Sequence, residues 1–122
     1  RGTLLSGEDH ELCARVQAAG LGAIYTPAAR VRHWVPASRM RVAYFLHWFY
    51  WSGITAATMD GEGHGVRTVL GVPRHLLRQF ATGLLGATGA LLRGRLSASV
   101  DRALDTAFAA GYTACRLGFV AG

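Results

Sequence analysis

Residues 6–15 read SGEDHELCAR, and this stretch decides how the first part of the chain folds. Ser6 and Asp9 have the spacing of a capping box, and the acidic pair Glu8-Asp9 suits the positive end of a helix. Apolar residues follow at helical spacing, and Gly20 is a natural residue for a helix to stop at. The apolar positions are Leu12, Cys13, Val16 and Ala19. The stretch therefore predicts a helix that begins at the acidic pair and ends before Gly20.

Short extended segments are predicted after this helix. Residues 23–25 (AIY) read as a strand that Pro27 ends, because strands favour β-branched and aromatic residues and exclude interior proline. Residues 30–34 (RVRHW) alternate in polarity and read as a second extended piece, which Pro36 closes.

The remainder of the chain reads as helical. A long helix over 39–58 carries aromatic residues on every side, so we expect it to be buried in protein or partly in lipid. Pro73 opens a helix that extends to about Arg93, and Ser97 or Ser99 caps a last helix. Glycines recur within these helices and indicate close helix packing, as occurs in or on membranes. They are Gly83, Gly86, Gly89 and Gly111.

Composition limits the function classes. The 122 residues make one domain or part of one, and 13 arginines without a lysine give a formal charge of +6. This charge favours an anionic partner: nucleic acid, an anionic lipid surface or a phosphorylated substrate such as a nucleotide sugar. Genomic base composition accounts for the arginine content equally well. The basic residues are dispersed, which argues against a nucleic-acid-binding protein. Cys13 and Cys115 lack zinc-like spacing, and we expect buried free thiols in a reducing compartment.

The order of acidic pair, helix, strand and histidine resembles the acceptor-side half of a GT-A glycosyltransferase of the large inverting family 2. The resemblance covers roughly residues 5–55. It implies an α/β, Rossmann-like GT-A fold, of which this chain is a C-terminal portion, mostly α-helical with one or two short strands. The matching residues are Gly7-Glu8-Asp9 with Leu12 and Arg15, then Tyr25-Thr26-Pro27-Ala28 with Val31 and His33, then Tyr50-Trp51-Ser52-Gly53.

The resemblance also implies residue roles. Asp9, with Glu8 beside it, would be the general base that takes the proton of an acceptor hydroxyl; a solvated helix cap is the alternative. His33 would complete the coordination of a divalent metal on the donor diphosphate, since neutral imidazole is a competent ligand; a structural histidine is the alternative. Arg39 and Arg41 would contact the diphosphate leaving group or a lipid phosphate.

The expected protein is a membrane-associated enzyme of cell-envelope polysaccharide synthesis in bacteria, at the cytoplasmic face of the membrane. Residues 1–58 would be the acceptor-side part of the GT-A domain, and residues 59–122 a helical tail that docks on the membrane surface or another helix. Donor nucleotide sugar and hydroxyl acceptor would bind the full enzyme, with Mg²⁺ or Mn²⁺ but no nucleic acid. The donor half with its Asp-x-Asp motif would precede Arg1, so we expect these residues alone to be inactive and to hold no metal tightly. A non-catalytic basic module for membrane or helix docking is the alternative.

Overall fold

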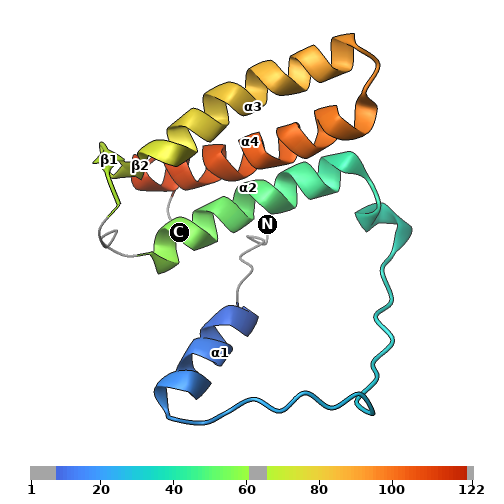
Figure 1. Cartoon of the computed structure of the whole chain (residues 1–122), viewed down its shortest axis with the longest axis vertical. Helices are drawn as coiled ribbons and strands as arrows, with labels where there is room; N and C mark the ends of the chain where they lie inside the picture. The colour runs from blue at the N-terminus through green and yellow to red at the C-terminus, as the bar shows by residue number, and fades with distance from the viewer. Residues whose placement is uncertain (1–7, 61–65, 121–122) are drawn as a thin grey trace.

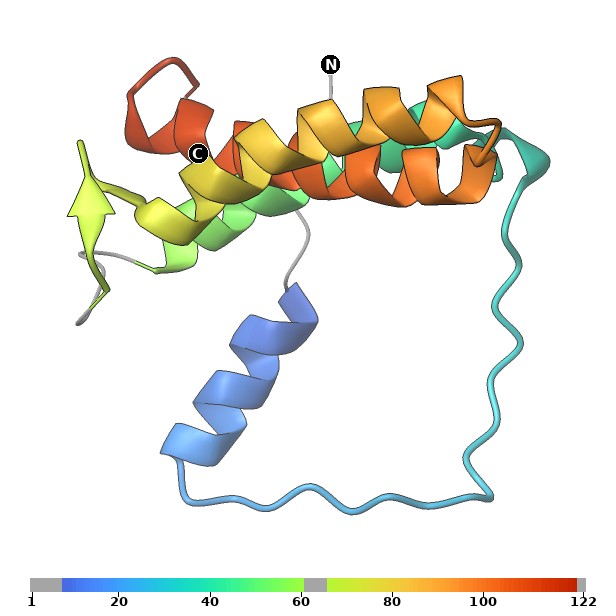
Figure 2. The same cartoon turned by 45° about the horizontal axis from the view of Figure 1, so that its top comes forward.

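The computed structural model describes residues 8–60 and 66–120, and most of them are helical, as predicted. Three long helices lie side by side, while α1 stands apart at the end of an open run of chain (Figures 1 and 2). The helices are α1 (Glu8–Ala18), the short 3-10 helix η1 (Ala37–Arg39), α2 (Val42–Met59), α3 (Arg74–Leu92) and α4 (Leu96–Arg116), and the strands are β1 (Thr68–Val69) and β2 (Val72–Pro73).

Helix α4 is the centre of the bundle, because it packs against α2 on one side and against α3 on the other (Figure 1). The buried cluster is contributed by all three helices and by β2; its members are Ala57, Val72, Leu76, Ala109 and Tyr112. Removal of these apolar side chains from water is the main force that holds the helices together. The cluster therefore contains residues from both parts of the chain, 1–58 and 59–122, that the sequence analysis distinguished.

Small residues let the helices approach closely. A Cβ atom on Gly111 of α4 would overlap the carbonyl oxygen of Tyr50 of α2. A Cβ atom on Gly83 of α3 would overlap the hydroxyl of Thr106 of α4. The predicted association of helical glycines with close packing is therefore confirmed at these two positions.

A two-residue hairpin joins α2 to α3, and it was not predicted. β1 and β2 pair antiparallel, with Val69 opposite Val72. Leu70 and Gly71 between them both have positive φ, 52° and 77°, as a type I′ turn requires. The guanidinium Nε of Arg116 donates a hydrogen bond of 3.1 Å to the carbonyl of Gly71, which ties the hairpin to the end of α4.

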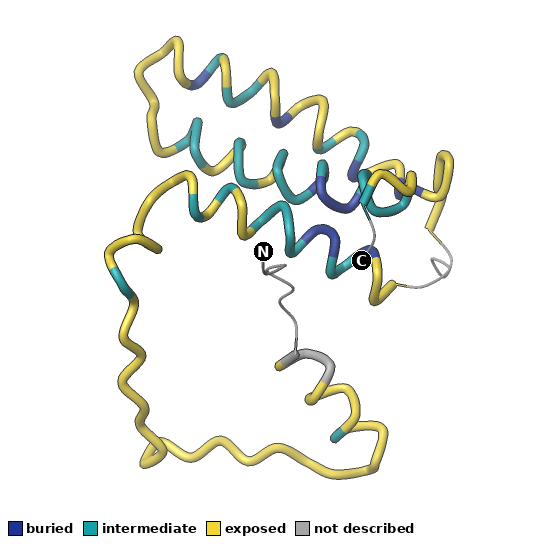
Figure 3. Tube along the Cα trace, turned by 180° about the vertical axis from the view of Figure 1, so that it is seen from behind, coloured by how far each residue is buried: buried dark blue, intermediate teal, exposed yellow. Residues whose placement is uncertain are grey.

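The strand predicted over 23–25 is wrong for this structure, and the extended piece predicted over 30–34 pairs with no described strand, because residues 21–36 form no regular element apart from a turn. A strand needs a neighbour to accept its hydrogen bonds, and this run passes through open space (Figures 1 and 2). Large apolar side chains remain uncovered: Ile24 is 93% exposed and Val31 is 96% exposed. Cys13 is exposed too, contrary to the prediction of a buried thiol, because α1 stands apart from the three packed helices (Figures 1 and 3).

The predicted helix ends need smaller corrections. The helix expected from residue 39 begins at Val42, because η1 occupies residues 37–39. Neither Ser97 nor Ser99 caps α4, whose N-cap residue is Arg95. The Ser99 hydroxyl instead donates a hydrogen bond of 2.9 Å to the carbonyl of Ala87, and so links α4 to α3. Within the described ranges, no helix combines the length and the apolar composition needed to cross a bilayer.

Tyr112 of α4 donates a hydrogen bond of 3.0 Å to the carboxylate of Asp60, just beyond α2. Burial of the ring and the nearby carboxylate raise the pKa of Tyr112 above 10.0. A raised pKa in the folded state means that stability is fully present below the unfolded-state pKa and is lost as the pH rises through the folded-state pKa. We therefore expect the unfolding free energy to decrease above about pH 10. Tyr112→Phe should remove the part of this decrease that comes from ionisation of Tyr112.

Tyr112→Phe should also cost about 1 kcal/mol of unfolding free energy at neutral pH, since one hydrogen bond is lost. Urea unfolding followed by circular dichroism at several pH values measures both effects. Tyr25→Phe is the matched control, because Tyr25 is 88% exposed. An identical alkaline loss of stability in the wild-type chain and in Tyr112→Phe would contradict this assignment.

Candidate functional site

The predicted base lies on the first turn of α1. Asp9 is exposed, and Glu8 is the first residue of the helix. The amide end of a helix favours negative charge, so this position suits an ionised carboxylate. The Ser6 of the predicted capping box lies outside the described residues, as does the side chain of Glu8.

The predicted metal ligand His33 lies in the irregular run between α1 and η1, and its side chain is exposed. Among the side chains that the structure describes, no three of histidine, cysteine, aspartate or glutamate form a group that could hold a metal ion. His33 is therefore a single donor in this structure, and a metal there would need further ligands from another part of the enzyme or from its substrate.

The predicted diphosphate contacts lie where the chain enters α2. Arg39 is the last residue of η1, and its guanidinium lies 5.8 Å from the centre of the Tyr44 ring, within reach of a cation–π interaction. Arg41 is the N-cap residue of α2 and is exposed. Both cations thus stand beside a helix N-terminus, an arrangement that favours anions.

The structure does not bring these predicted residues into one pocket. The acidic pair is on α1 and the arginines are at η1 and the start of α2, at opposite ends of the open run (Figures 1 and 2). Groups that act on one substrate must converge within a few ångströms. A working site from these residues would therefore need another structural unit to draw the two ends together.

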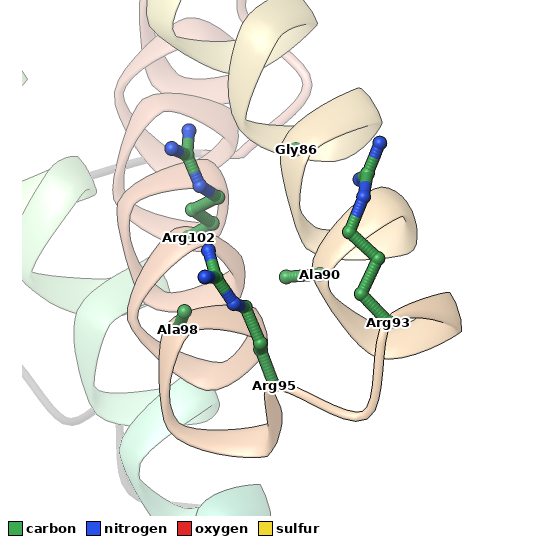
Figure 4. A pocket seen from close by; sticks show the side chains of 6 residues that line it. All are labelled: Gly86, Ala90, Arg93, Arg95, Ala98 and Arg102. Atoms are coloured by element: carbon green, nitrogen blue, oxygen red, sulfur yellow. The ribbon is translucent and has the colours of Figure 1, made fainter.

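A cavity of about 270 Å³ occurs at the turn between α3 and α4 (Figure 4). Its lining consists of small residues and arginines: Gly86, Ala90, Arg93, Arg95, Ala98 and Arg102. The small residues leave the hollow open between the helices, and none of the six is acidic. The cavity is therefore positively charged and suited to an anion.

The sequence analysis placed Arg93 near the end of a helix but did not single out Arg95 or Arg102. Arg95 and Arg102 are seven residues apart, which is two turns of a helix, so they share one face of α4. In Figure 4 their side chains run in the same direction along α4, while Arg93 lies on the α3 side. The seven-residue spacing could have been noticed in the sequence. It indicates a cavity only because Gly86 and Ala90 of α3 line the other side of it.

Comparison of the chain with known protein families, with curated proteins and with solved structures finds no match.

Proposed function

We propose that this chain is the acceptor-side, C-terminal part of an inverting glycosyltransferase with a GT-A fold. The enzyme transfers a sugar from a nucleotide donor to a hydroxyl of a lipid-linked or polysaccharide acceptor. The observation that carries the proposal is the uncovered apolar run of residues 21–36. It coincides with the segment in which the sequence resembles that family.

Four large apolar side chains of this run are almost fully exposed: Ile24, Tyr25, Val31 and Trp34. Burial of one such side chain stabilises a protein by about 1.5–3 kcal/mol. Residues of this kind, without a cover of their own, indicate a surface that another structural unit completes. The donor-binding half of the enzyme supplies that cover in the proposal, and its sheet supplies the neighbour that the strand over 23–25 needs.

In the assembled site, Asp9 with Glu8 beside it takes the proton of the acceptor hydroxyl as the hydroxyl attacks. The guanidinium groups of Arg39 and Arg41 hold the departing diphosphate. His33 fits a divalent metal only as one ligand among several, and such a metal would supply charge neutralisation on the diphosphate. Asp9 and the two arginines carry out the steps assigned to this chain.

A second function is favoured by the outer face of α3, which we define as Phe80, Leu84, Leu85, Leu91 and Leu92. All five side chains are exposed. They fall within an arc of about 140° at ~100° per residue, so they form one apolar face. Such a face supports association with a membrane surface, either by the enzyme or by a non-catalytic docking module.

Sugar transfer by the full-length gene product distinguishes the two functions. We expect purified full-length protein to transfer or hydrolyse sugar from at least one of a set of UDP-, GDP- and TDP-sugars, and to lose this activity in EDTA. We also expect the chain before Arg1 to contain an Asp-x-Asp motif after a strand. Product formation is measured by chromatography of the released nucleoside diphosphate. Absence of both the motif and nucleoside diphosphate release would leave the docking module as the function.

A further inference from the structure

The arginines of the α3–α4 cavity are not neutralised within the described part of the chain. The guanidinium groups of Arg95 and Arg102 have no hydrogen bond or ion pair there, and the guanidinium of Arg93 donates only to the carbonyl of Gly89 in its own helix, at 2.9 Å. The guanidinium group of Arg116, at the C-terminal end of α4, donates a hydrogen bond to the carbonyl of Gly71 and lies 5.9 Å from the centre of the Tyr112 ring. The N–H donors of the cavity arginines are thus available for a ligand, whereas Arg116 stabilises the fold through its contacts with Gly71 and Tyr112.

The size and the lining of the cavity indicate which chemical group it can bind. At about 270 Å³ the cavity is smaller than the typical small-molecule pocket of ~300–1,000 Å³, so it suits a single charged group better than a whole nucleotide. Guanidinium groups bind phosphate oxygens through paired hydrogen bonds. Because the remaining lining is alanine and glycine, the recognition rests on the phosphate and not on a base or a sugar.

Apolar side chains surround the same turn. Leu92 is 83% exposed and Leu96 is 65% exposed, on either side of Gly94, whose φ of 68° lets the chain reverse. A free phosphate in water gains nothing from nearby leucines. A phospholipid headgroup presents a phosphate next to acyl chains, so it offers a partner to both the arginines and the leucines.

We propose that the α3–α4 cavity binds the phosphate of an anionic phospholipid headgroup, with Leu92 and Leu96 inserted beside it at the membrane surface. The proposal names the site of the membrane association proposed above, on which it rests, and it does not depend on sugar transfer. The guanidinium groups of Arg95 and Arg102 hold the phosphate in this arrangement.

Vesicle flotation at ~0.1 M salt tests the site. We expect the wild-type chain to float with vesicles of phosphatidylcholine and phosphatidylglycerol in equal parts, and not with phosphatidylcholine alone. Arg95→Gln with Arg102→Gln should weaken this binding by about 25-fold, since each arginine near an anionic surface contributes about fivefold.

Arg74→Gln with Arg78→Gln is the matched control, because it removes the same charge from the other end of α3. Arg74 and Arg78 lie beside the apolar face of α3, so they too can approach an anionic surface, but Arg78 is about 22 Å from Arg93 along the helix at ~1.5 Å per residue and cannot contact a phosphate in the cavity. We expect the control pair to weaken binding by a smaller factor than the cavity pair does, because it removes surface charge but no contact with the phosphate.

A variant without any charge change tests the geometry. A Cβ atom on Gly86 would lie 2.7 Å from both Cδ and Nη1 of Arg102, so Gly86→Ala must displace that side chain. The displaced group is flexible, and alanine favours a helix more than glycine does, so the fold should be kept. We expect about fivefold weaker binding to the anionic vesicles, the contribution of one arginine.

The outcomes separate the possible failures. If the wild-type chain floats with anionic vesicles and Arg95→Gln with Arg102→Gln floats equally well, the cavity is not the site, although membrane association stands. An equal loss in the control pair also overturns the cavity, because charge alone then accounts for binding. If the wild-type chain floats with neither vesicle, membrane association itself fails. Titration with soluble glycerol phosphate completes the test: Arg95-dependent binding of it without any vesicle binding would assign the cavity to a free phosphate and overturn the lipid.

Discussion

Gly111→Ala is expected to lower the unfolding free energy of the helical bundle by about 3 kcal/mol, the upper part of the usual range for overpacking a core. The new Cβ atom would overlap the carbonyl oxygen of Tyr50, and it would lie 2.8 Å from the carbonyl carbon of the same residue. These are backbone atoms of α2, so no side-chain rotation relieves the overlap. The helices must separate, and the separation loosens the cluster around Ala109 and Tyr112.

Gly86→Ala is the matched control for this prediction, because it makes the same change in α3 where the nearest atoms belong to the flexible side chain of Arg102. We expect its stability to equal or exceed that of the wild-type chain by up to about 1 kcal/mol, through helix propensity. Urea unfolding followed by circular dichroism measures both variants. If the two variants unfold at the same urea concentration, α2 and α4 do not approach as closely as the structure has them.

The helices were predictable because their signals are local. Apolar periodicity with Gly20, Pro73 and the aromatic run located α1, α2 and α3 to within a few residues of the observed bounds. The first residue of α4 was harder to predict from the sequence. Serine caps helices in many proteins, but here Ser99 bonds to Ala87 of the neighbouring helix, a contact that depends on the tertiary packing.

The strands were not predictable in this way. The hairpin turn is Leu70-Gly71, and leucine is not a residue that signals a positive φ. Residues 23–25 have the composition of a strand but lack a neighbour among residues 8–60 and 66–120. Strand formation depends on a distant partner, so composition alone predicted a strand at residues 23–25, where none pairs, and overlooked the short pair that exists.

The two candidate sites also differ in whether a local sequence pattern or the tertiary packing reveals them. The acidic pair, His33 and the arginines near α2 were identified by a pattern along the chain, and the described residues do not gather them. The arginine cavity arises from the packing of α3 on α4, where Gly86 and Ala90 leave room beside Arg102. A sequence pattern identifies residue types, but convergence of those residues requires the tertiary contacts.

Asp9→Asn, in the full-length enzyme, is expected to lower turnover at least ~100-fold, the usual scale of a lost general base. That factor raises the activation free energy by about 2.7 kcal/mol. Asparagine has nearly the same shape as aspartate and is well tolerated at a helix N-terminus, so α1 should keep its structure. The asparagine amide, however, does not accept a proton from an attacking hydroxyl.

Steady-state kinetics with a nucleotide sugar distinguishes loss of the base from a structural effect. We expect kcat to fall while KM for the donor changes little, because the base acts on the acceptor hydroxyl in the transition state. Asp105→Asn is the matched control, because Asp105 is an exposed carboxylate on α4, and it should leave both constants unchanged. If Asp9→Asn and Asp105→Asn turn over alike, the base is another residue, and Asp9 serves only the start of α1.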